Sequence, residues 1–196
     1  MAIHPSCLHY NNSLSNAVKF YFDSIGLKVK IRPVNRLDKD TSGLVVFAKN
    51  QYIQECLVKQ MIDNTFKKTY LAILTGKLEK NNGTINAPIA RKNNSIIERC
   101  IDNNGDISIT DYKVLKTFKN YTLTQFKLKT GRTHQIRVHS KFIGHPILGD
   151  SLYGSSSPLI SRQALHAYKI EFVHPLKHNK VVYNSKIPKD IETLII

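Results

Sequence analysis

The chain has 196 residues, 41% of them hydrophobic, which is enough to bury the core of one domain or of two small ones. Its 29 Lys and Arg against 14 Asp and Glu give a formal net charge of +15. Such an excess favours a polyanionic partner, RNA or DNA, over a basic surface that serves solubility alone. The separated cysteines Cys7, Cys56 and Cys100 exclude a disulfide framework. With no membrane-spanning run and no signal peptide, we expect a cytoplasmic protein.

Two helices and a strand are predicted in the first part of the chain. Ser13 can cap a helix that starts at Leu14, places apolar residues at helical spacing and stops at Gly26. Asn50 can cap a second helix with its own apolar stripe. Residues 67–74 then alternate and are rich in strand formers. We expect the first helix to serve packing.

The segment between these two helices carries the most unusual charges. Residues 36–43 read Arg-Leu-Asp-Lys-Asp-Thr-Ser-Gly and place two carboxylates, Asp38 and Asp40, in a chain that is otherwise strongly basic. A tight Thr-Ser-Gly turn is expected to fix where these carboxylates point, and the apolar residues 44–47 are expected to form a strand. This segment is our candidate for the chemistry.

The second half of the chain is predicted to consist mainly of strands. The predicted strands are residues 84–89, a hairpin of 107–118 with 121–128, and a last pair, 169–174 with 181–183. Helices interspersed with antiparallel pairs indicate an α+β fold. We expect a mixed, mainly antiparallel sheet flanked by helices and loops.

A second informative segment, residues 131–140, reads Gly-Arg-Thr-His-Gln-Ile-Arg-Val-His-Ser. Thr133 is expected to cap a helix on which His134, Arg137 and Lys141 share one face. The backbone N–H groups at such a helix start favour phosphate, although a solvated basic helix is the alternative. The candidate RNA contacts in this segment are Arg132, His134 and Gln135.

Two other kinds of site are disfavoured. The chain has eight histidines, but His134 and His139 stand five positions apart and not at the i, i+4 spacing of one helical face, and no acidic cluster joins them. No serine lies in a glycine-flanked elbow between a strand and a helix, which argues against a serine hydrolase. We therefore expect no metal and no serine nucleophile.

Five co-linear segments resemble the RluA-type pseudouridine synthases, and together they cover nearly the whole chain. The matching segments are residues 36–44 with 47–49, 68–70, 131–139, 144–150 with 153–154, and 162–167. Asn35 departs from the pattern, because the family usually has histidine there; this puts a local hydrogen bond in doubt but not the chemistry. The resemblance implies one catalytic domain over residues 1–196, without the N-terminal part of the family pattern and without an S4 RNA-binding domain.

The resemblance also implies an activity, the isomerisation of uridine to pseudouridine in RNA, which needs no redox cofactor. Asp38 matches the family's essential aspartate, and Tyr70 matches the tyrosine that stacks on the uracil. Arg137 fits the cation that a carboxylate in a dry pocket needs, so we expect it within hydrogen-bonding distance of Asp38. Arg36 matches the arginine implicated in filling the gap left by an extruded base.

The expected partner is RNA, and the resemblance favours ribosomal RNA over transfer RNA. We expect a monomer that does not contact a membrane. Two alternatives remain open: a non-catalytic RNA-binding module, which requires no intact Asp38, and a hydrolase that uses Asp38 and Asp40 as a carboxylate pair. Against the pair, Asp40 directly precedes the Thr-Ser-Gly segment, where a turn-capping aspartate is expected.

Overall fold

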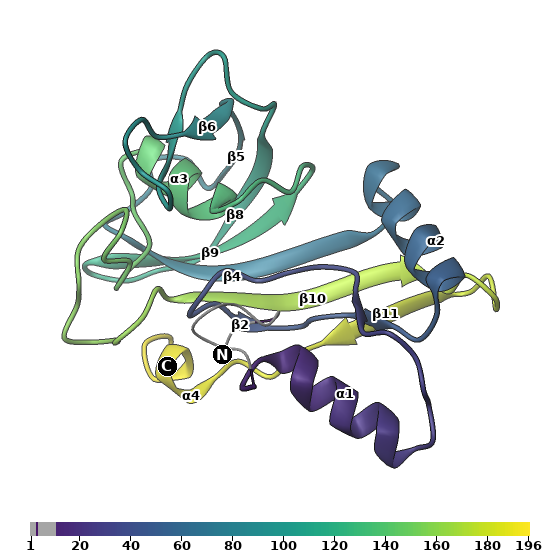
Figure 1. Ribbon diagram of the computed structural model, residues 1–196. Helices are drawn as coiled ribbons and strands as arrows, with labels where there is room; N and C mark the ends of the chain where they lie inside the picture. Colours follow the sequence, from purple (N-terminus) through teal and green to yellow (C-terminus); the bar gives the residue numbers. More distant parts are fainter. Residues whose placement is uncertain (1–2, 4–10) are drawn as a thin grey trace. The chain divides into compact units, whose positions relative to one another are not determined.

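The computed structural model describes Ile3 and residues 11–196. These residues form two compact units, and Figure 1 labels their helices and most of their strands. Unit 1 contains Ile3 and residues 11–40, 44–67 and 170–183. Unit 2 contains residues 41–43, 68–169 and 184–196. The single catalytic domain expected over residues 1–196 stays a prediction.

Both units combine helices with strands, and most strand pairs are antiparallel, so the predicted α+β fold is confirmed. The helices are α1 (Leu14–Ser24), α2 (Gln51–Ile62), α3 (Gln135–Phe142) and α4 (Lys189–Glu192). The strands are β1 (Arg32–Pro33), β2 (Ser42–Gly43), β3 (Phe47–Ala48), β4 (Lys67–Thr75), β5 (Asn82–Asn86), β6 (Ile89–Arg91), β7 (Arg99–Ile101), β8 (Ile109–Thr117), β9 (Tyr121–Leu128), β10 (Leu165–Val173) and β11 (Lys180–Asn184).

The two helices of unit 1 begin at the predicted caps. The Ser13 side chain accepts a hydrogen bond from the backbone N–H of Asn16, and the Asn16 side chain accepts one from the backbone N–H of Ser13, which completes a capping box. Asn50 caps α2 by accepting from Ile53 N at 2.9 Å. Gly26 follows α1 with a φ of 73°, a left-handed conformation that glycine adopts without steric cost.

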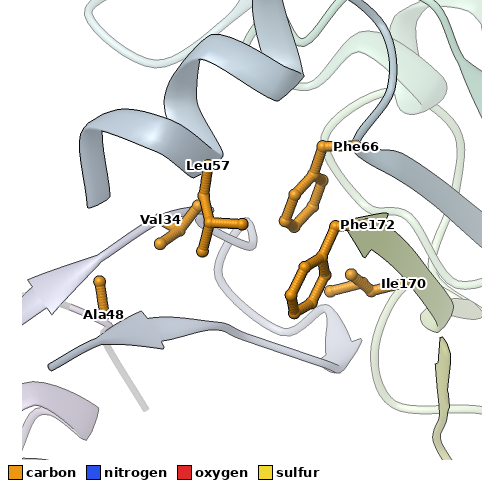
Figure 2. Packing of buried hydrophobic residues seen from close by; sticks show 6 residues of the cluster. All are labelled: Val34, Ala48, Leu57, Phe66, Ile170 and Phe172. Carbon is orange, nitrogen blue, oxygen red and sulfur yellow. The ribbon is translucent and has the colours of Figure 1, made fainter. Parts of the chain in front are cut away.

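Unit 1 has its own hydrophobic core, shown in Figure 2. Apolar side chains of α2 pack there against the segments before and after the helix and against the second half of β10. The rings of Phe66 and Phe172 are stacked, with their centroids 5.4 Å apart. The buried members are Val34, Ala48, Leu57, Phe66, Ile170 and Phe172.

The strands of unit 1 are shorter than the sequence predicted. The strand predicted over residues 44–47 is wrong in extent, because only β3 pairs, antiparallel to β1 with Arg32 opposite Ala48. Residues 44–46 are irregular backbone, and the side chains of Leu44 and Val46 still pack on the core. The predicted final pair of strands is confirmed as β10 and β11, although β10 begins earlier, at Leu165.

Unit 2 is built on a sheet with the strand order β10-β4-β9-β8-β5, to which β10 contributes its first half. The predicted hairpin is confirmed as β8 and β9, with an irregularity between Val114 and Lys116. β4 pairs antiparallel with β9, and β2 pairs parallel with β10. The strand predicted over residues 84–89 is divided, because β5 ends at Asn86 and pairs with β8 while β6 starts at Ile89 and pairs with β7.

Three further features of the described residues bear on the class of protein. None of their helices is both long and apolar enough to cross a membrane. No group of three or more His, Cys, Asp or Glu side chains in this part of the chain could hold a metal ion. Cys56 and Cys100 are free thiols, whereas Cys7 lies outside the described residues.

Candidate active site

Asp38 lies in unit 1 on irregular backbone and is half-buried, with the exposed Arg36 two residues before it. The turn predicted at Thr-Ser-Gly is wrong in position. The chain turns earlier, at Lys39 and Asp40, and Asp40 is exposed with a φ of 65°. Aspartate tolerates this left-handed conformation better than most residues. The two carboxylates therefore lie in different surroundings, since Asp38 is the more protected of the two.

The Asn35 side chain connects the two ends of the segment that carries Asp38. Its side chain accepts a hydrogen bond from Val46 N at 2.8 Å and donates one to the Leu44 carbonyl at 3.2 Å, and it is 8% exposed. The backbone N–H of Val34 also donates to the Val46 carbonyl, at 2.8 Å. The amide of Asn35 thus supplies both a donor and an acceptor where the family pattern has histidine. The sequence alone did not predict this structural role for Asn35.

Tyr70 lies on β4 in unit 2, opposite Phe126 of β9, and is 7% exposed. Lys68 lies two residues earlier on the same strand, so its side chain projects to the same face as that of Tyr70. Burial lowers the pKa of Lys68. Its ammonium group lies beside Gly131, where an added Cβ would be 3.4 Å from Nζ. A lysine and a tyrosine thus project from one face of β4.

Arg137 is held by a carboxylate that the sequence analysis did not identify as a site residue. Its Nε donates to Asp150 Oδ2 at 2.7 Å and its Nη2 to Oδ1 at 2.8 Å. The side chains are 8% and 0% exposed, respectively. The guanidinium also lies 4.9 Å from the centroid of the Tyr153 ring, a cation–π contact. The only sequence signal for this pair was the motif that contains Asp150 and Tyr153.

The start of α3 differs from its prediction. Its N-cap is His134, which adopts a left-handed φ of 57° and makes no side-chain cap bond, so the cap predicted at Thr133 is wrong. The prediction that His134, Arg137 and Lys141 share one face of this helix is also wrong. Arg137 is buried and His134 is half-buried, whereas Lys141 is exposed. The physical reason is the buried ion pair with Asp150, which draws the guanidinium into unit 2.

Gln135 takes the place of a side-chain cap. Its oxygen accepts hydrogen bonds from Thr130 Oγ1 at 2.8 Å and Arg132 N at 2.9 Å. Its nitrogen donates to Thr110 Oγ1 at 2.8 Å and to the Ile109 carbonyl at 3.1 Å. The amide is thus fully used inside the protein, and the residue is 2% exposed. An RNA contact by Gln135 stays a prediction that this hydrogen bonding does not favour.

His134 and Tyr153 join α3 to the β6–β7 hairpin. Nδ1 of His134 lies 2.8 Å from the hydroxyl of Tyr153, which accepts a hydrogen bond from Arg99 N at 2.8 Å. The Tyr153 hydroxyl thus bridges the His134 side chain and the backbone of β7. Burial raises the pKa of Tyr153, while the backbone N–H of Arg99 and the charge of Arg137 oppose this rise.

Arg132 lines a cleft of about 480 Å³ on the surface of unit 2. Its guanidinium is half exposed and lies 3.7 Å from a carboxylate oxygen of Asp106. Two further arginines, Arg91 and Arg99, line the same cleft, together with backbone of Gly105 and Gly131. Three guanidinium groups against one carboxylate leave the cleft with an excess of positive charge. Such a cleft suits an anionic group of small size.

Unit 2 contains five of the predicted site residues, which are Tyr70 on β4 and four that lie together at the start of α3. Arg132, His134 and Gln135 precede or open α3, and Arg137 follows on its first turn. Asp38 and Arg36 belong to unit 1. The hydrogen bond expected between Asp38 and Arg137 stays a prediction. Asp150 already uses the Nε–Nη2 edge of the guanidinium, so a second carboxylate would have to use its remaining N–H groups.

Comparison with known proteins gives the class to which this α+β protein belongs. Residues 2–141 match the family model described as RNA pseudouridylate synthase. The chain belongs to this family. The matched residues include Asp38, Tyr70 and Arg137.

Individual relatives agree with this assignment. The chain is 41% identical to an uncharacterized RNA pseudouridine synthase, YhcT, of Bacillus subtilis, over 99% of this chain and 65% of that protein. It is 38% identical to a ribosomal large subunit pseudouridine synthase D of Nitrosomonas europaea, over 100% of this chain and 59% of that protein. The chain thus spans about two thirds or less of the length of these relatives.

Solved structures support the fold alone. Human RNA pseudouridylate synthase domain containing 4 matches with a TM-score of 0.77 at 19% identity, covering 98% of this chain and 85% of that one. Human RNA pseudouridylate synthase domain containing 1 matches with a TM-score of 0.74 at 24% identity, covering 93% and 83%.

Proposed function

We propose that this protein isomerises specific uridines in RNA to pseudouridine, with Asp38 as the essential carboxylate. In this reaction the N1–C1′ bond breaks, the uracil turns, and a C5–C1′ bond forms; C5 loses a proton and N1 gains one, so the composition does not change. The observation that carries the proposal is the family match, which includes the segment around Asp38. The half-buried position of Asp38, beside an exposed Asp40, supports the assignment of one carboxylate to the chemistry.

Tyr70 and Arg137 complete the proposed catalytic set. The buried ring of Tyr70 is fixed in β4, which suits a side chain that stacks on a flat base. Asp150 and Tyr153 immobilise the guanidinium of Arg137, so this cation would lose little conformational freedom on meeting a charged group. The proposal leaves open whether Asp38 attacks the sugar, attacks the base or removes a ribose proton.

We further propose that the net charge of +15 and the cleft lined by Arg91, Arg99 and Arg132 hold the RNA backbone. A uridine in an RNA helix must be extruded at a cost of a few kcal/mol, and the exposed Arg36 would occupy the vacated position. Ribosomal RNA is favoured over transfer RNA, because several relatives are named as ribosomal large subunit enzymes. A cytoplasmic location and a monomeric state belong to the same proposal.

The reaction offers a direct test, because the proton at C5 of the target uracil is released. RNA transcribed with tritium at C5 should release tritium to water when incubated with the protein. We expect release from a large-subunit ribosomal RNA transcript and less from transfer RNA transcripts. Asp38→Asn should abolish release while RNA binding survives, and Asp40→Asn should leave most activity. Turnover by Asp38→Asn would reject the proposal.

The same two variants separate the rival functions. A non-catalytic RNA-binding module would bind these transcripts and release no tritium in any variant, including the unmodified protein. A hydrolase with a carboxylate pair would lose its activity equally in Asp38→Asn and Asp40→Asn. The exposure of Asp40 in a left-handed turn argues against that second outcome.

A further inference from the structure

The three residues Thr41, Ser42 and Gly43 lie along the first half of β10 and belong to unit 2. Ser42 and Gly43 form β2, which pairs parallel with His166 and Ala167. Gly43 has a φ of 120°, and a Cβ at this position would lie 2.3 Å from the Ala167 carbonyl oxygen. Any larger residue would therefore displace the strand pair. The sequence predicts a turn here, but the structure shows a segment fixed against a strand.

Side chains of unit 2 hold the same segment at two more points. Oγ of Ser42 lies 2.9 Å from Nδ1 of His166, and Nε2 of Gln163 donates to Oγ1 of Thr41 at 3.2 Å. His166 is 2% exposed and Gln163 is 5% exposed. We call this set of contacts, from Gln163, His166 and Ala167 to Thr41, Ser42 and Gly43, the β2 clamp.

Arg162 anchors the segment of the β2 clamp that carries Gln163 and His166. Arg162 pairs with Asp190 of α4 through Nε at 2.7 Å and Nη2 at 3.0 Å. Its Nη1 donates to the carbonyls of Gln163 and Leu165, each at 3.3 Å. Burial and the charge of Arg162 lower the pKa of His166, while Asp190 and the backbone of Lys186 oppose this. At pH values above the ordinary histidine pKa of about 6.5, the imidazole is therefore neutral, and it lies on a segment that Arg162 fixes.

We infer that His166 and Gln163 are positioning residues for Asp38, because the β2 clamp fixes the chain three residues beyond it; this inference rests on the proposed function. Three residues of extended chain span at most about 11 Å, so fixing Thr41 restricts where Asp38 can lie. On the other side, Asn35 fixes the chain three residues before it. A displacement of about 1 Å can cost a reaction on the order of a hundredfold in rate.

The clamp can be tested by paired substitutions that keep or remove one hydrogen bond. Ser42→Ala and His166→Leu remove the contact between Oγ and Nδ1, whereas His166→Asn places a polar atom near the position of Nδ1. Thr122→Val is the matched control, because it removes a buried hydroxyl bond to the Gly76 carbonyl in the same unit, far along the chain from Asp38. Each variant is assayed for tritium release and for binding to the same transcript.

We expect Ser42→Ala and His166→Leu to lower kcat about tenfold to a hundredfold, with KM and RNA affinity within about twofold of the unmodified protein. His166→Asn should recover most of the loss, and Thr122→Val should change kcat little. Equal losses in Ser42→Ala and Thr122→Val would overturn the inference. So would a loss that appears in RNA affinity and not in kcat.

A second measurement keeps the clamp falsifiable if the proposed activity fails. Hydrogen exchange of the backbone amides at residues 38–43 should be faster in Ser42→Ala than in Thr122→Val. A protein that releases no tritium yet shows this difference would reject the proposed function and leave the clamp standing as a structural device. Unchanged exchange in an active protein would reject the clamp.

Discussion

Arg137 and Asp150 form a buried bidentate ion pair in unit 2, with Nε 2.7 Å from Oδ2 and Nη2 2.8 Å from Oδ1. Oδ1 of Asp150 also accepts from the backbone N–H groups of Leu152 and Tyr153, at 3.1 and 3.2 Å. One carboxylate thus fixes both the guanidinium and the loop that carries the aromatic ring over it. The cation proposed for catalysis is held in place by the protein itself.

Replacing Asp150 by asparagine should strongly destabilise the fold. The substitution leaves the buried charge of Arg137 without its partner, and breaking such a pair costs about 3–5 kcal/mol. Urea unfolding of the two proteins measures this difference. Asp23→Asn is the control, because it breaks a half-exposed pair with Lys19 on α1, worth about 1 kcal/mol or less. Equal changes in the two variants would contradict the structural importance of the buried pair.

Substitutions of Arg137 should separate its charge from its shape. Lysine keeps the positive charge but cannot reproduce two parallel hydrogen bonds to Asp150, whereas methionine removes the charge altogether. Arg137→Lys should therefore retain some tritium release and Arg137→Met very little. Full activity in Arg137→Met would show that another residue, such as Arg132, supplies the catalytic cation.

The elements that the sequence predicted well are those fixed by neighbouring residues. Ser13 and Asn50 cap their helices through bonds to backbone three residues away, so the signal lies within one turn. Thr133 carried the same signal, but no cap formed there. Gln135, whose partners include Thr110 and Ile109 of a distant strand, instead holds the segment before α3. Tertiary hydrogen bonds replaced the local one.

Contacts between residues far apart in the chain also limit how much of the candidate site the sequence can predict. The acidic segment indicated Asp38, the family resemblance indicated Tyr70, and the need for a cation indicated Arg137. Nothing in the sequence showed that Arg137 already has a carboxylate partner thirteen residues later. Nor could it show that Ser42 meets His166, more than a hundred residues away. Such pairs depend on which strands become neighbours, and that choice is made by the fold as a whole.

Asn35 offers a test of the position at which the chain departs from its family pattern. Asn35→Ala removes a donor to the Leu44 carbonyl and an acceptor for Val46 N, both in a nearly buried setting. Leaving such groups unpaired costs about 1–3 kcal/mol, which thermal or urea unfolding can measure. The exposed Asn93 provides the control, since Asn93→Ala should change stability little. Activity should fall further than stability alone explains, because Asp38 follows closely in the chain.

Two buried histidines, His139 and His166, should make the stability of the protein depend on pH. Nε2 of His139 lies 3.0 Å from the Ala87 carbonyl, which can only accept, so Nε2 carries the proton and Nδ1 accepts from Thr110 Oγ1 at 2.9 Å. Burial lowers the pKa of His139, although its bond to the Ala87 carbonyl opposes this, and burial also lowers the pKa of His166. Both side chains are therefore neutral in the folded protein over a pH range in which the unfolded chain binds protons.

The sign of the effect follows from proton binding. Between the lowered pKa of each folded histidine and the ordinary value of about 6.5, the unfolded chain holds more protons, so the free energy of unfolding rises with pH. The stabilisation is fully present above that ordinary value and is lost as the pH falls through the folded pKa. Urea unfolding at closely spaced pH values from about 5 to 8 should show stability increasing and then levelling off. The slope of stability against pH should flatten in His166→Asn, which has no titrating ring at this position. It should persist in the control His178→Asn. His178 is an exposed histidine in a left-handed conformation, which asparagine tolerates. An equal slope in all three proteins would show that neither the burial of His166 nor its bond to Ser42 governs the acid side of the stability curve.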